Sequence, residues 1–394
     1  MRKAAGAWLT LRRMRWPRAR PSDGLALLSV LRSGNWGGWP SPNQQASRFA
    51  DRFARMHDAA HGICTSSGTT ALQIVYRGLG IGPGDQIIVP ALTFSSVAGA
   101  AVEIGAEPVF ADVDPTMLCV DPRSVDARIT PRTRAVVAVH LGAQLCNLDA
   151  LRALCADRGL ALIEDCAHAH GGKWRGRGVG AWSTAGCFSF QSTKALSAGE
   201  GGMILTNDAE LAARCRSLIN CGRPSSPDQR PQSILGGNYR MTELQAALLT
   251  TQLRRFPAQL RRRAESIALL DKLLANCAAV EVLKPQEGVT QRPCYAYAFR
   301  LRRDVHHGIR RDRFLSELFL RGYPASAIYQ PVYDAPEYGR RDPRAKLPEP
   351  LACPEAERAA RETVWLSHML LLCGGRAVRR LAEAIESAAT AAKT

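Results

Sequence analysis

Three short segments of this 394-residue chain carry side chains of the types that cofactor chemistry uses. The segment Ser66–Thr70 precedes an apolar stretch of helical periodicity, so its backbone N–H groups are expected at a helix N-terminus, where phosphate binds readily. Asp165 closes the apolar run Ala161–Asp165, a predicted buried strand, and ligands bind beyond such strand ends in parallel sheets. Lys194 follows a further apolar strand in a chain with only seven lysines. A lysine of lowered pKa can form a Schiff base.

Each of these segments also has an interpretation without a ligand. Ser66–Thr70 could be a plain helix N-cap, and Lys194 could lie in a surface loop, as most lysines do, whereas a buried Asp165 needs a cationic partner. Taken together and in this order, however, they supply a phosphate-binding turn, a carboxylate for a pyridine nitrogen and an amine for an aldehyde. Pyridoxal 5'-phosphate (PLP) requires those three groups, so the sequence predicts a PLP site.

Other candidate motifs are weaker. Asp165, Cys166, His168 and His170 lie close together in the sequence, but no second ligand cluster completes a metal shell, and we predict no metal site. The glycines at alternate positions in Gly176–Gly180 do not follow a strand, so a hairpin turn is favoured over a nucleotide-binding loop.

The predicted elements form a sheet, and Asp165 lies at the edge of that sheet where ligands usually bind. The helical spacing of Leu148–Arg158 between two apolar runs implies a right-handed crossover and a mostly parallel sheet. The fold class is therefore α/β: a large domain with a mostly parallel central sheet flanked by helices. The predicted strands are Gln86–Pro90, Pro108–Asp112, Ala135–His140 and Ala161–Asp165.

The C-terminal third is predicted to form a smaller α+β domain. A long helix begins near Thr242, where Thr242–Gln245 fits a capping box, and runs through Arg255. We predict a basic N-terminal arm at 1–22, a large PLP-binding domain at 23–256 and a small domain at 257–394. The elements predicted after the long helix are a strand at Tyr295–Leu301 and helices at Arg311–Arg321 and Ala377–Ala391.

Composition excludes some functions and leaves others open. The net charge of +17 comes almost entirely from arginine spread along the chain, which suits anionic partners in general and predicts no particular patch. No apolar run reaches the ~20 residues of a membrane span. Twelve scattered cysteines lack C-x-x-C spacing, which favours free thiols in a reducing cytoplasm. Met1–Arg20 is basic without an apolar core, so a mobile or subunit-covering arm is favoured over a leader peptide.

The ordered motifs together resemble those of the DegT/DnrJ/EryC1/StrS aminotransferases, the sugar-aminotransferase branch of the fold-type I PLP enzymes. The resemblance covers the chain from about Trp16 to its end. The stretches that carry it are Ser67–Leu72, Gly80–Asp85, Val89–Phe94, Ile129–Thr133, Glu164–Gly171, Phe188–Lys194, Gly199–Gly202 and Gly237–Glu243.

The resemblance implies a role for each residue around the cofactor ring. Lys194 would hold PLP as the internal aldimine and then shuttle the proton between two carbon atoms. Asp165 would pair with the pyridinium nitrogen. Phe94 would stack on one face of the ring, and His168, where many relatives have glutamine, would lie against the other.

The resemblance also implies how the phosphate is held and how the site is assembled. Gly68, Thr69 and Ser189 would bind the phosphate, joined by Asn238 from a partner subunit. A homodimer with shared active sites follows from this resemblance and not from composition.

The implied reaction is transfer of an amino group from L-glutamate or L-glutamine, through a pyridoxamine phosphate intermediate. The acceptor would be a keto-sugar, with a nucleotide-linked one expected, or a keto-cyclitol. Relatives carry histidines where this chain has Pro293–Tyr297 and Ile328–Tyr333, so the acceptor site differs here. Tyr329 and Tyr333 are the candidate substrate contacts.

Two alternatives stay open at this stage. One is a PLP-dependent dehydratase and aromatase of the 3-amino-5-hydroxybenzoate synthase type, which Asn220–Pro224 and Trp365–His368 also resemble. The other is a non-catalytic regulator or nucleic-acid-binding protein on the same scaffold. The retained Lys194, Asp165 and phosphate turn favour the enzyme, which needs no nucleic acid or membrane as a partner.

Overall fold

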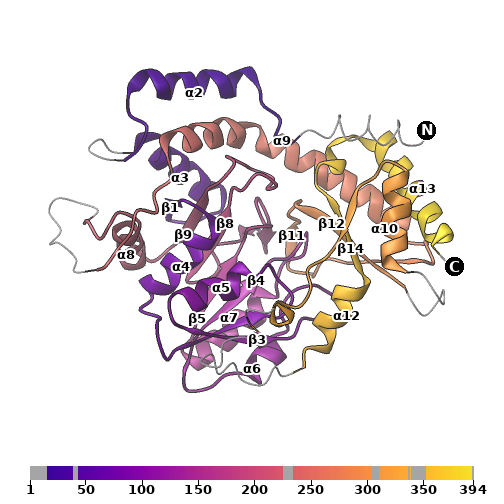
Figure 1. Cartoon of the computed structure of the whole chain (residues 1–394), viewed down its shortest axis with the longest axis horizontal. Coiled ribbons are helices and arrows are strands. Elements are labelled where there is room, and N and C mark those ends of the chain that lie inside the picture. Colours follow the sequence, from indigo (N-terminus) through magenta and orange to yellow (C-terminus); the bar gives the residue numbers. More distant parts are fainter. Residues whose placement is uncertain are drawn as a thin grey trace.

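A seven-stranded sheet forms the centre of the larger part of the molecule (Figure 1). The structure is a computed structural model that describes residues 16–38, 43–224, 234–302, 310–335, 338 and 352–392. The strand order is β1-β9-β8-β5-β4-β2-β3, in which β9 alone runs antiparallel to its neighbours. The mostly parallel sheet is thus confirmed. Its strands are β1 (His61–Thr65), β2 (Gln86–Pro90), β3 (Glu107–Ala111), β4 (Thr133–Val139), β5 (Ala161–Asp165), β8 (Ala185–Ser189) and β9 (Gly202–Thr206).

Helices cover both faces of this sheet because successive side chains of each buried strand point to opposite sides. On one face, Ile87 and Ile163 pack with Leu72 of α4 and Leu211 of α8. On the other, Leu162 packs with α3, α7 and α9. The helices of this part are α2 (Pro21–Ser33), α3 (Gln44–Met56), α4 (Gly68–Gly78), α5 (Ser96–Glu103), α6 (Pro122–Asp126), α7 (Leu148–Arg158), α8 (Ala209–Ile219) and α9 (Glu243–Leu274).

The long helix α9 joins the two parts of the molecule (Figure 1). The capping box predicted at its start is present: the Thr242 hydroxyl accepts from the Gln245 N–H, and the Gln245 side chain accepts from the Thr242 N–H. The helix continues through Pro257 to Leu274, beyond the predicted end near Arg255. The boundary predicted at 256/257 therefore falls inside a helix, and α9 belongs to both parts of the molecule.

The C-terminal part contains a four-stranded antiparallel sheet of order β10-β12-β14-β13. In a separate three-stranded sheet, β11-β6-β7, a strand of the C-terminal part pairs with the β6–β7 hairpin of the larger part, which turns at Arg175 and Gly176 as the glycine pattern predicted. The strands are β6 (Lys173–Trp174), β7 (Arg177–Gly178), β10 (Val280–Val282), β11 (Val289–Gln291), β12 (Ala296–Leu301), β13 (Ala325–Ala327) and β14 (Thr363–Ser367). The helices are α10 (Arg311–Leu320), α12 (Pro354–Glu362), α13 (Gly375–Ala391) and the 3₁₀ turns η1 (Val332–Asp334) and η2 (Leu370–Leu372).

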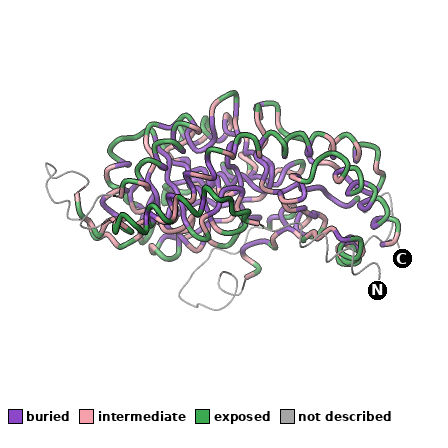
Figure 2. The backbone as a smooth tube through the Cα atoms, turned by 90° about the horizontal axis from the view of Figure 1, so that it is seen from above, coloured by how far each residue is buried: buried purple, intermediate pink, exposed green. Residues whose placement is uncertain are grey.

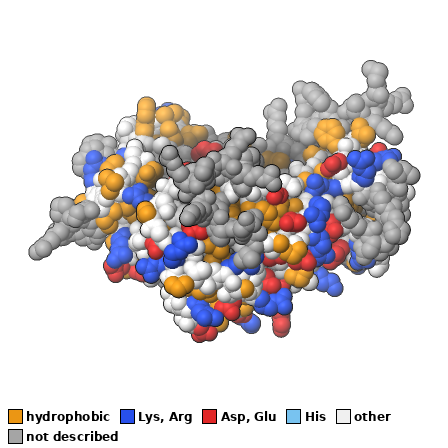
Figure 3. Space-filling view, turned by 60° about the horizontal axis from the view of Figure 1, so that its bottom comes forward, with side chains coloured by type: hydrophobic (Ala, Val, Ile, Leu, Met, Phe, Trp, Pro, Cys, Tyr) orange, Lys and Arg blue, Asp and Glu red, His pale blue; other side chains and the backbone are white. Residues whose placement is uncertain are grey.

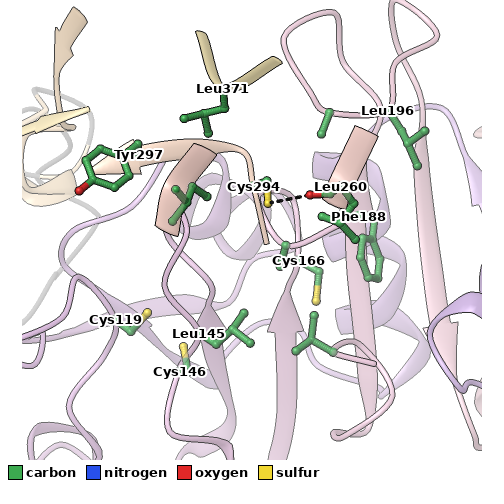
Figure 4. Close-up of a cluster of buried hydrophobic side chains, with 14 of the residues drawn as sticks. Cys119, Leu145, Cys146, Cys166, Phe188, Leu196, Leu260, Cys294, Tyr297 and Leu371 are labelled. Atoms are coloured by element: carbon green, nitrogen blue, oxygen red, sulfur yellow. Dashed lines mark hydrogen bonds between the residues drawn. The ribbon is translucent and has the colours of Figure 1, made fainter. Parts of the chain in front are cut away.

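Nine of the twelve cysteines are buried and serve as small apolar residues of the core. All twelve are free thiols, and most are buried. Figure 4 shows Cys119, Cys146, Cys166 and Cys294 among aliphatic and aromatic side chains. Burial raises the pKa of the Cys294 thiol to about 12, which keeps it protonated and unreactive.

The distribution of buried and exposed residues agrees with this arrangement of sheets and helices. Buried backbone runs through the middle of the molecule, and exposed segments lie at its edges (Figure 2). On the face in Figure 3, lysine and arginine side chains alternate with acidic ones. No helix within the described residues has the length and apolarity needed to span a membrane.

Candidate active site

A cavity of about 430 Å³ opens where β4, β5 and β8 end and α4 begins. Eight of the ten predicted site residues line it, although they come from separate stretches of the chain. These eight are Gly68, Thr69, Phe94, Asp165, His168, Ser189, Lys194 and Tyr329.

The first turn of α4 forms one end of the cavity. Ser67 caps this helix, its hydroxyl accepting the Thr70 N–H at 3.1 Å. The N–H groups of Gly68 and Thr69, like those of any first turn, have no helical acceptor. A side chain at Gly68 would place its Cβ only 2.8 Å from the Ser189 Cβ. Glycine therefore keeps the helix end close to Ser189, which leaves donors exposed to an anion.

Asp165 is a buried carboxylate with spare hydrogen-bonding capacity. Its Oδ1 accepts the Ala167 N–H at 2.9 Å, and no described residue donates to Oδ2. Burial raises the pKa of Asp165 above its ordinary value, opposed by the Ala167 N–H and by Lys194. A cationic N–H in the cavity would satisfy this carboxylate and favour its ionised form.

The adjacent Glu164 is fully satisfied. It accepts from His140 Nε2 (3.1 Å), Gly180 N (2.8 Å), Trp182 N (3.1 Å) and Ser183 Oγ (2.8 Å). Although burial alone raises it, the pKa of Glu164 is held below its ordinary value by the bonds from His140, Gly180 and Ser183.

His140, Glu164 and Cys166 also bring possible metal-ligating atoms within 4.8 Å of one another. The His140 Nδ1 already accepts the Cys146 N–H at 3.1 Å, so its Nε2 carries the proton that Glu164 accepts. Both imidazole nitrogens are thereby occupied, and this cluster stabilises the end of β5.

Lys194 provides the amine of the cavity. Burial lowers the pKa of Lys194 from 10.5 to about 8, while the charge of Asp165 opposes this decrease. Its Nζ lies 4.7 Å from the centre of the Tyr295 ring. A substantial unprotonated fraction at mildly alkaline pH makes this amine nucleophilic, as Schiff-base formation requires.

Aromatic rings form the remaining walls. The His168 ring stacks on Tyr295 with centroids 3.8 Å apart and planes inclined by 6°. Burial lowers the pKa of His168 well below its ordinary value, so the ring is neutral. Phe94 lies 5.7 Å from Tyr329 and is 55% exposed. The cavity thus offers flat apolar surfaces to a planar ligand.

Two predicted residues lie elsewhere. Asn238 is exposed, pairs its backbone with Asn220 and does not line this cavity. Tyr333 was predicted with Tyr329 as a substrate contact, but the structure places it outside the cavity, where its hydroxyl donates to Glu357 at 3.1 Å. The residues of η1 turn the chain after Tyr329, which separates the two tyrosines.

Tyr295 is a cavity residue that sequence reasoning missed. The segment that contains it was singled out only for its lack of histidines. Tyr295 immediately precedes β12, and its proximity to His168 depends on how the start of β12 packs against the large sheet. No local pattern in the sequence carries that information.

Comparison with known proteins places this cavity in context. Residues 24–386 match the DegT/DnrJ/EryC1/StrS aminotransferase family. A putative L-glutamine:3-amino-2,3-dideoxy-scyllo-inosose aminotransferase of Streptomyces kanamyceticus is 39% identical over 387 residues, covering 94% of this chain and 92% of that protein. An L-glutamine:2-deoxy-scyllo-inosose aminotransferase of Streptomyces paromomycinus is also 39% identical over 387 residues, covering 91% and 89%.

The fold has solved counterparts as well. The crystal structure of 3-amino-5-hydroxybenzoic acid (AHBA) synthase superposes with a TM-score of 0.86 at 32% identity. The match covers 96% of this chain and 98% of that one.

Proposed function

The chain belongs to the DegT/DnrJ/EryC1/StrS aminotransferase family and is a PLP-dependent aminotransferase; from this premise we propose the residues and the substrate class of its reaction. L-Glutamine or L-glutamate would donate the amino group, and a keto-cyclitol or keto-sugar would receive it. The observation that carries this proposal is the convergence of Lys194, Asp165 and the first turn of α4 on one cavity.

The cavity fits PLP. The space at Gly68, which a Cβ would fill, and the N–H groups of the first turn of α4, which have no helical acceptor, suit a phosphate. The free Oδ2 of Asp165 suits a protonated pyridine nitrogen, and the Lys194 amine suits an aldehyde. Gly68, Thr69 and Ser189 would hold the phosphate, while Phe94 and His168 would bound the ring.

When bound, PLP supplies an electron sink for the electron pair of a C–H bond beside the transferred nitrogen. Lys194 Nζ is the cavity group suited to moving the proton, because its pKa of about 8 lies near neutrality. Asp165, kept ionised by its pyridinium partner, would keep that nitrogen protonated. The neutral His168 adds no competing charge beside the ring.

The named substrates of the relatives favour a keto-cyclitol as acceptor, and the cavity wall of one subunit adds no dedicated cationic partner for a diphosphate. Within the described part of the cavity wall, Lys194 is the sole lysine or arginine, and the aldehyde would engage it. A nucleotide-linked sugar carries a diphosphate that needs cationic partners. The named substrates of the relatives from S. kanamyceticus and S. paromomycinus are scyllo-inososes, which are cyclic polyhydroxy ketones.

We further propose that the enzyme works as a cytoplasmic homodimer with shared sites. The 55% exposed Phe94 on the cavity wall and the 85% exposed Leu235 near Asn238 support a covering partner. The second copy would bring Asn238 to the phosphate. The buried free thiols suit a reducing compartment.

The visible absorbance of the purified enzyme tests the reaction. Addition of L-glutamine or L-glutamate should bleach the band of the lysine-bound cofactor, and 2-deoxy-scyllo-inosose should restore it with an aminated product detectable by mass spectrometry. Lys194→Ala should abolish turnover. A band that ignores both donors while an ultraviolet-absorbing product forms by loss of water would replace this proposal with the AHBA synthase type of reaction.

Subunit mixing tests the shared site. Lys194→Ala and Asn238→Ala each damage a different half of every site, so statistical exchange between the two variants should restore about one quarter of the wild-type sites. Recovery of activity on mixing is the expected result. If no mixture regains activity although subunits exchange, Asn238 does not act across an interface.

A further inference from the structure

The backbone on both sides of Lys194 is held by the N–H groups of two aromatic rings. The indole Nε1–H of Trp16 donates to the Lys194 carbonyl at 2.9 Å. The His368 ring, through Nε2, bonds to the preceding carbonyl, that of Thr193, also at 2.9 Å. Trp16 and His368 contact each other edge to face, with centroids 4.7 Å apart. Two consecutive carbonyls of the lysine turn therefore have partners from opposite ends of the chain.

Arg263 determines which nitrogen of His368 can donate. Its Nη2 lies 3.0 Å from His368 Nδ1, and its Nε donates to the His368 carbonyl at 3.4 Å. A guanidinium has donors only, so Nδ1 must be the lone-pair nitrogen and Nε2 must carry the proton. Arg263 thus fixes the tautomer that donates to Thr193.

Arg263 is an unusual residue to find in this position. Its side chain is completely buried, and no carboxylate among the described residues is paired with it. Instead, its guanidinium lies 5.2 Å from the centre of the Trp16 ring. Burial lowers the pKa of Arg263 to about 10 and that of His368 to about 3. A buried cation without a carboxylate is costly, which indicates a specific use for it.

We propose that Trp16, His368 and Arg263 are positioning residues that fix the backbone of Lys194, so that Trp16, which precedes α2, supports the active site. Arg263 orients His368, and His368 and Trp16 hold the two carbonyls. The fixed backbone turn then directs the Lys194 side chain into the cavity, and rotation about the bonds of this side chain is the movement that remains to the amine. This proposal rests on the proposed role of Lys194, but the order of its backbone can be measured without any cofactor.

Amide hydrogen exchange of the cofactor-free protein is the first measurement. Trp16→Phe keeps a ring against His368 and removes the N–H. Peptides covering 190–198 should exchange about 5-fold faster, the ratio expected for the loss of one ordinary hydrogen bond. Trp36→Phe is the matched control, because Trp36 also donates its indole N–H to a backbone carbonyl, that of Leu31, on the exposed surface.

The histidine provides a rescue test. His368→Gln retains a side-chain N–H that can reach the Thr193 carbonyl, whereas His368→Phe retains only the ring. We expect His368→Phe to resemble Trp16→Phe in exchange and His368→Gln to lie near the wild type. In the loaded enzyme, Trp16→Phe should lower kcat about 10-fold with little change in KM for the amino donor, because the misplaced lysine affects chemistry more than binding.

Two outcomes would overturn the proposal. One is equal exchange over 190–198 in Trp16→Phe, Trp36→Phe and wild type. The other is faster exchange throughout the protein with a lower Tm, which would assign Trp16 a general packing role. If exchange over 190–198 becomes faster but the Lys194→Ala variant still turns over, Trp16 and His368 do hold the Lys194 backbone, and it is the proposed function that fails.

Discussion

Glu164 and Asp165 are consecutive residues at the end of β5, yet they belong to two different regions of the molecule. Strand alternation points Glu164 to the face covered by α3, α7 and α9, and Asp165 to the face where α4 borders the cavity. Glu164 accepts four hydrogen bonds, and its pKa is lowered. Asp165 accepts one from the described residues, and burial raises its pKa.

The difference teaches how to tell a structural carboxylate from a functional one in this fold. A carboxylate whose lone pairs are all used by the protein contributes to folding and has nothing left to offer a ligand. A carboxylate left short of donors costs folding free energy, and a bound cofactor can repay this cost. The two neighbours should therefore respond in opposite ways to the same loss of charge.

The largest expected effect is on catalysis by Asp165→Asn. We expect kcat/KM to fall about 1,000-fold, because one preorganised electrostatic partner of the reacting system is lost. The free energy of unfolding of the cofactor-free protein should not decrease, since a poorly compensated buried charge is removed. Steady-state kinetics measures kcat/KM, and urea unfolding of the same preparation measures the free energy of unfolding. A loss of stability in Asp165→Asn as large as that in Glu164→Gln would contradict the distinction between the two carboxylates.

The next effect is on folding, by Glu164→Gln. The uncharged amide has one acceptor oxygen fewer than the carboxylate, so two of the four hydrogen bonds to this side chain are lost, and the free energy of unfolding should fall by about 3 kcal/mol. Because the folded-state pKa of Glu164 lies below its ordinary value of 4.5, its contribution is complete above that pH and is lost as pH falls. The difference in stability between variant and wild type should thus shrink in acid. A constant difference from pH 7 to pH 4 would contradict this account.

A smaller effect is expected at the opposite end of the cavity, from Gly68→Ala. The new Cβ would lie 2.8 Å from the Ser189 Cβ, so the helix end must shift away from the phosphate position. We expect PLP affinity to weaken about 10-fold, as measured by fluorescence titration of the cofactor-free protein. Gly82→Ala is the control, since its nearest neighbouring atom lies at 4.0 Å. If the Gly68→Ala and Gly82→Ala variants bind PLP with equal affinity, the close approach of Gly68 to Ser189 has no part in binding the phosphate.

The smallest effect is a shift in pH dependence. PLP loading onto cofactor-free enzyme requires the neutral Lys194 amine, so the loading rate should rise with pH through a midpoint of about 8. The Asp165 charge raises the pKa of Lys194, so in Asp165→Asn the midpoint should move to lower pH. In Glu164→Gln it should stay in place. Stopped-flow absorbance over pH 6–10 distinguishes these variants, and equal shifts in both would show that Asp165 has no special coupling to the amine.

Local pattern was sufficient for much of the fold. The runs at 86–90 and 161–165 form strands with the predicted bounds, and Leu148–Arg158 forms the predicted helix. In each of them the apolar residues recur with the spacing of a strand or a helix, and the pattern has a recognisable end. Such signals are contained within a few consecutive residues. The end of α9 was predicted too early because Pro257 and the arginines beyond it gave no signal that buried side chains continue to Leu274.

By itself, the sequence determined which residues could meet PLP, because the helix cap, the strand-end carboxylate and the lysine are each defined by near neighbours in the chain. Tertiary structure alone decided which other groups reach them. Tyr295 against His168, Tyr333 turned to Glu357, and Trp16 on the Lys194 carbonyl all join segments far apart in the sequence. The physical reason is that hydrogen bonding and packing between remote segments depend on how complete elements dock, whereas periodicity and capping act within one turn or one strand.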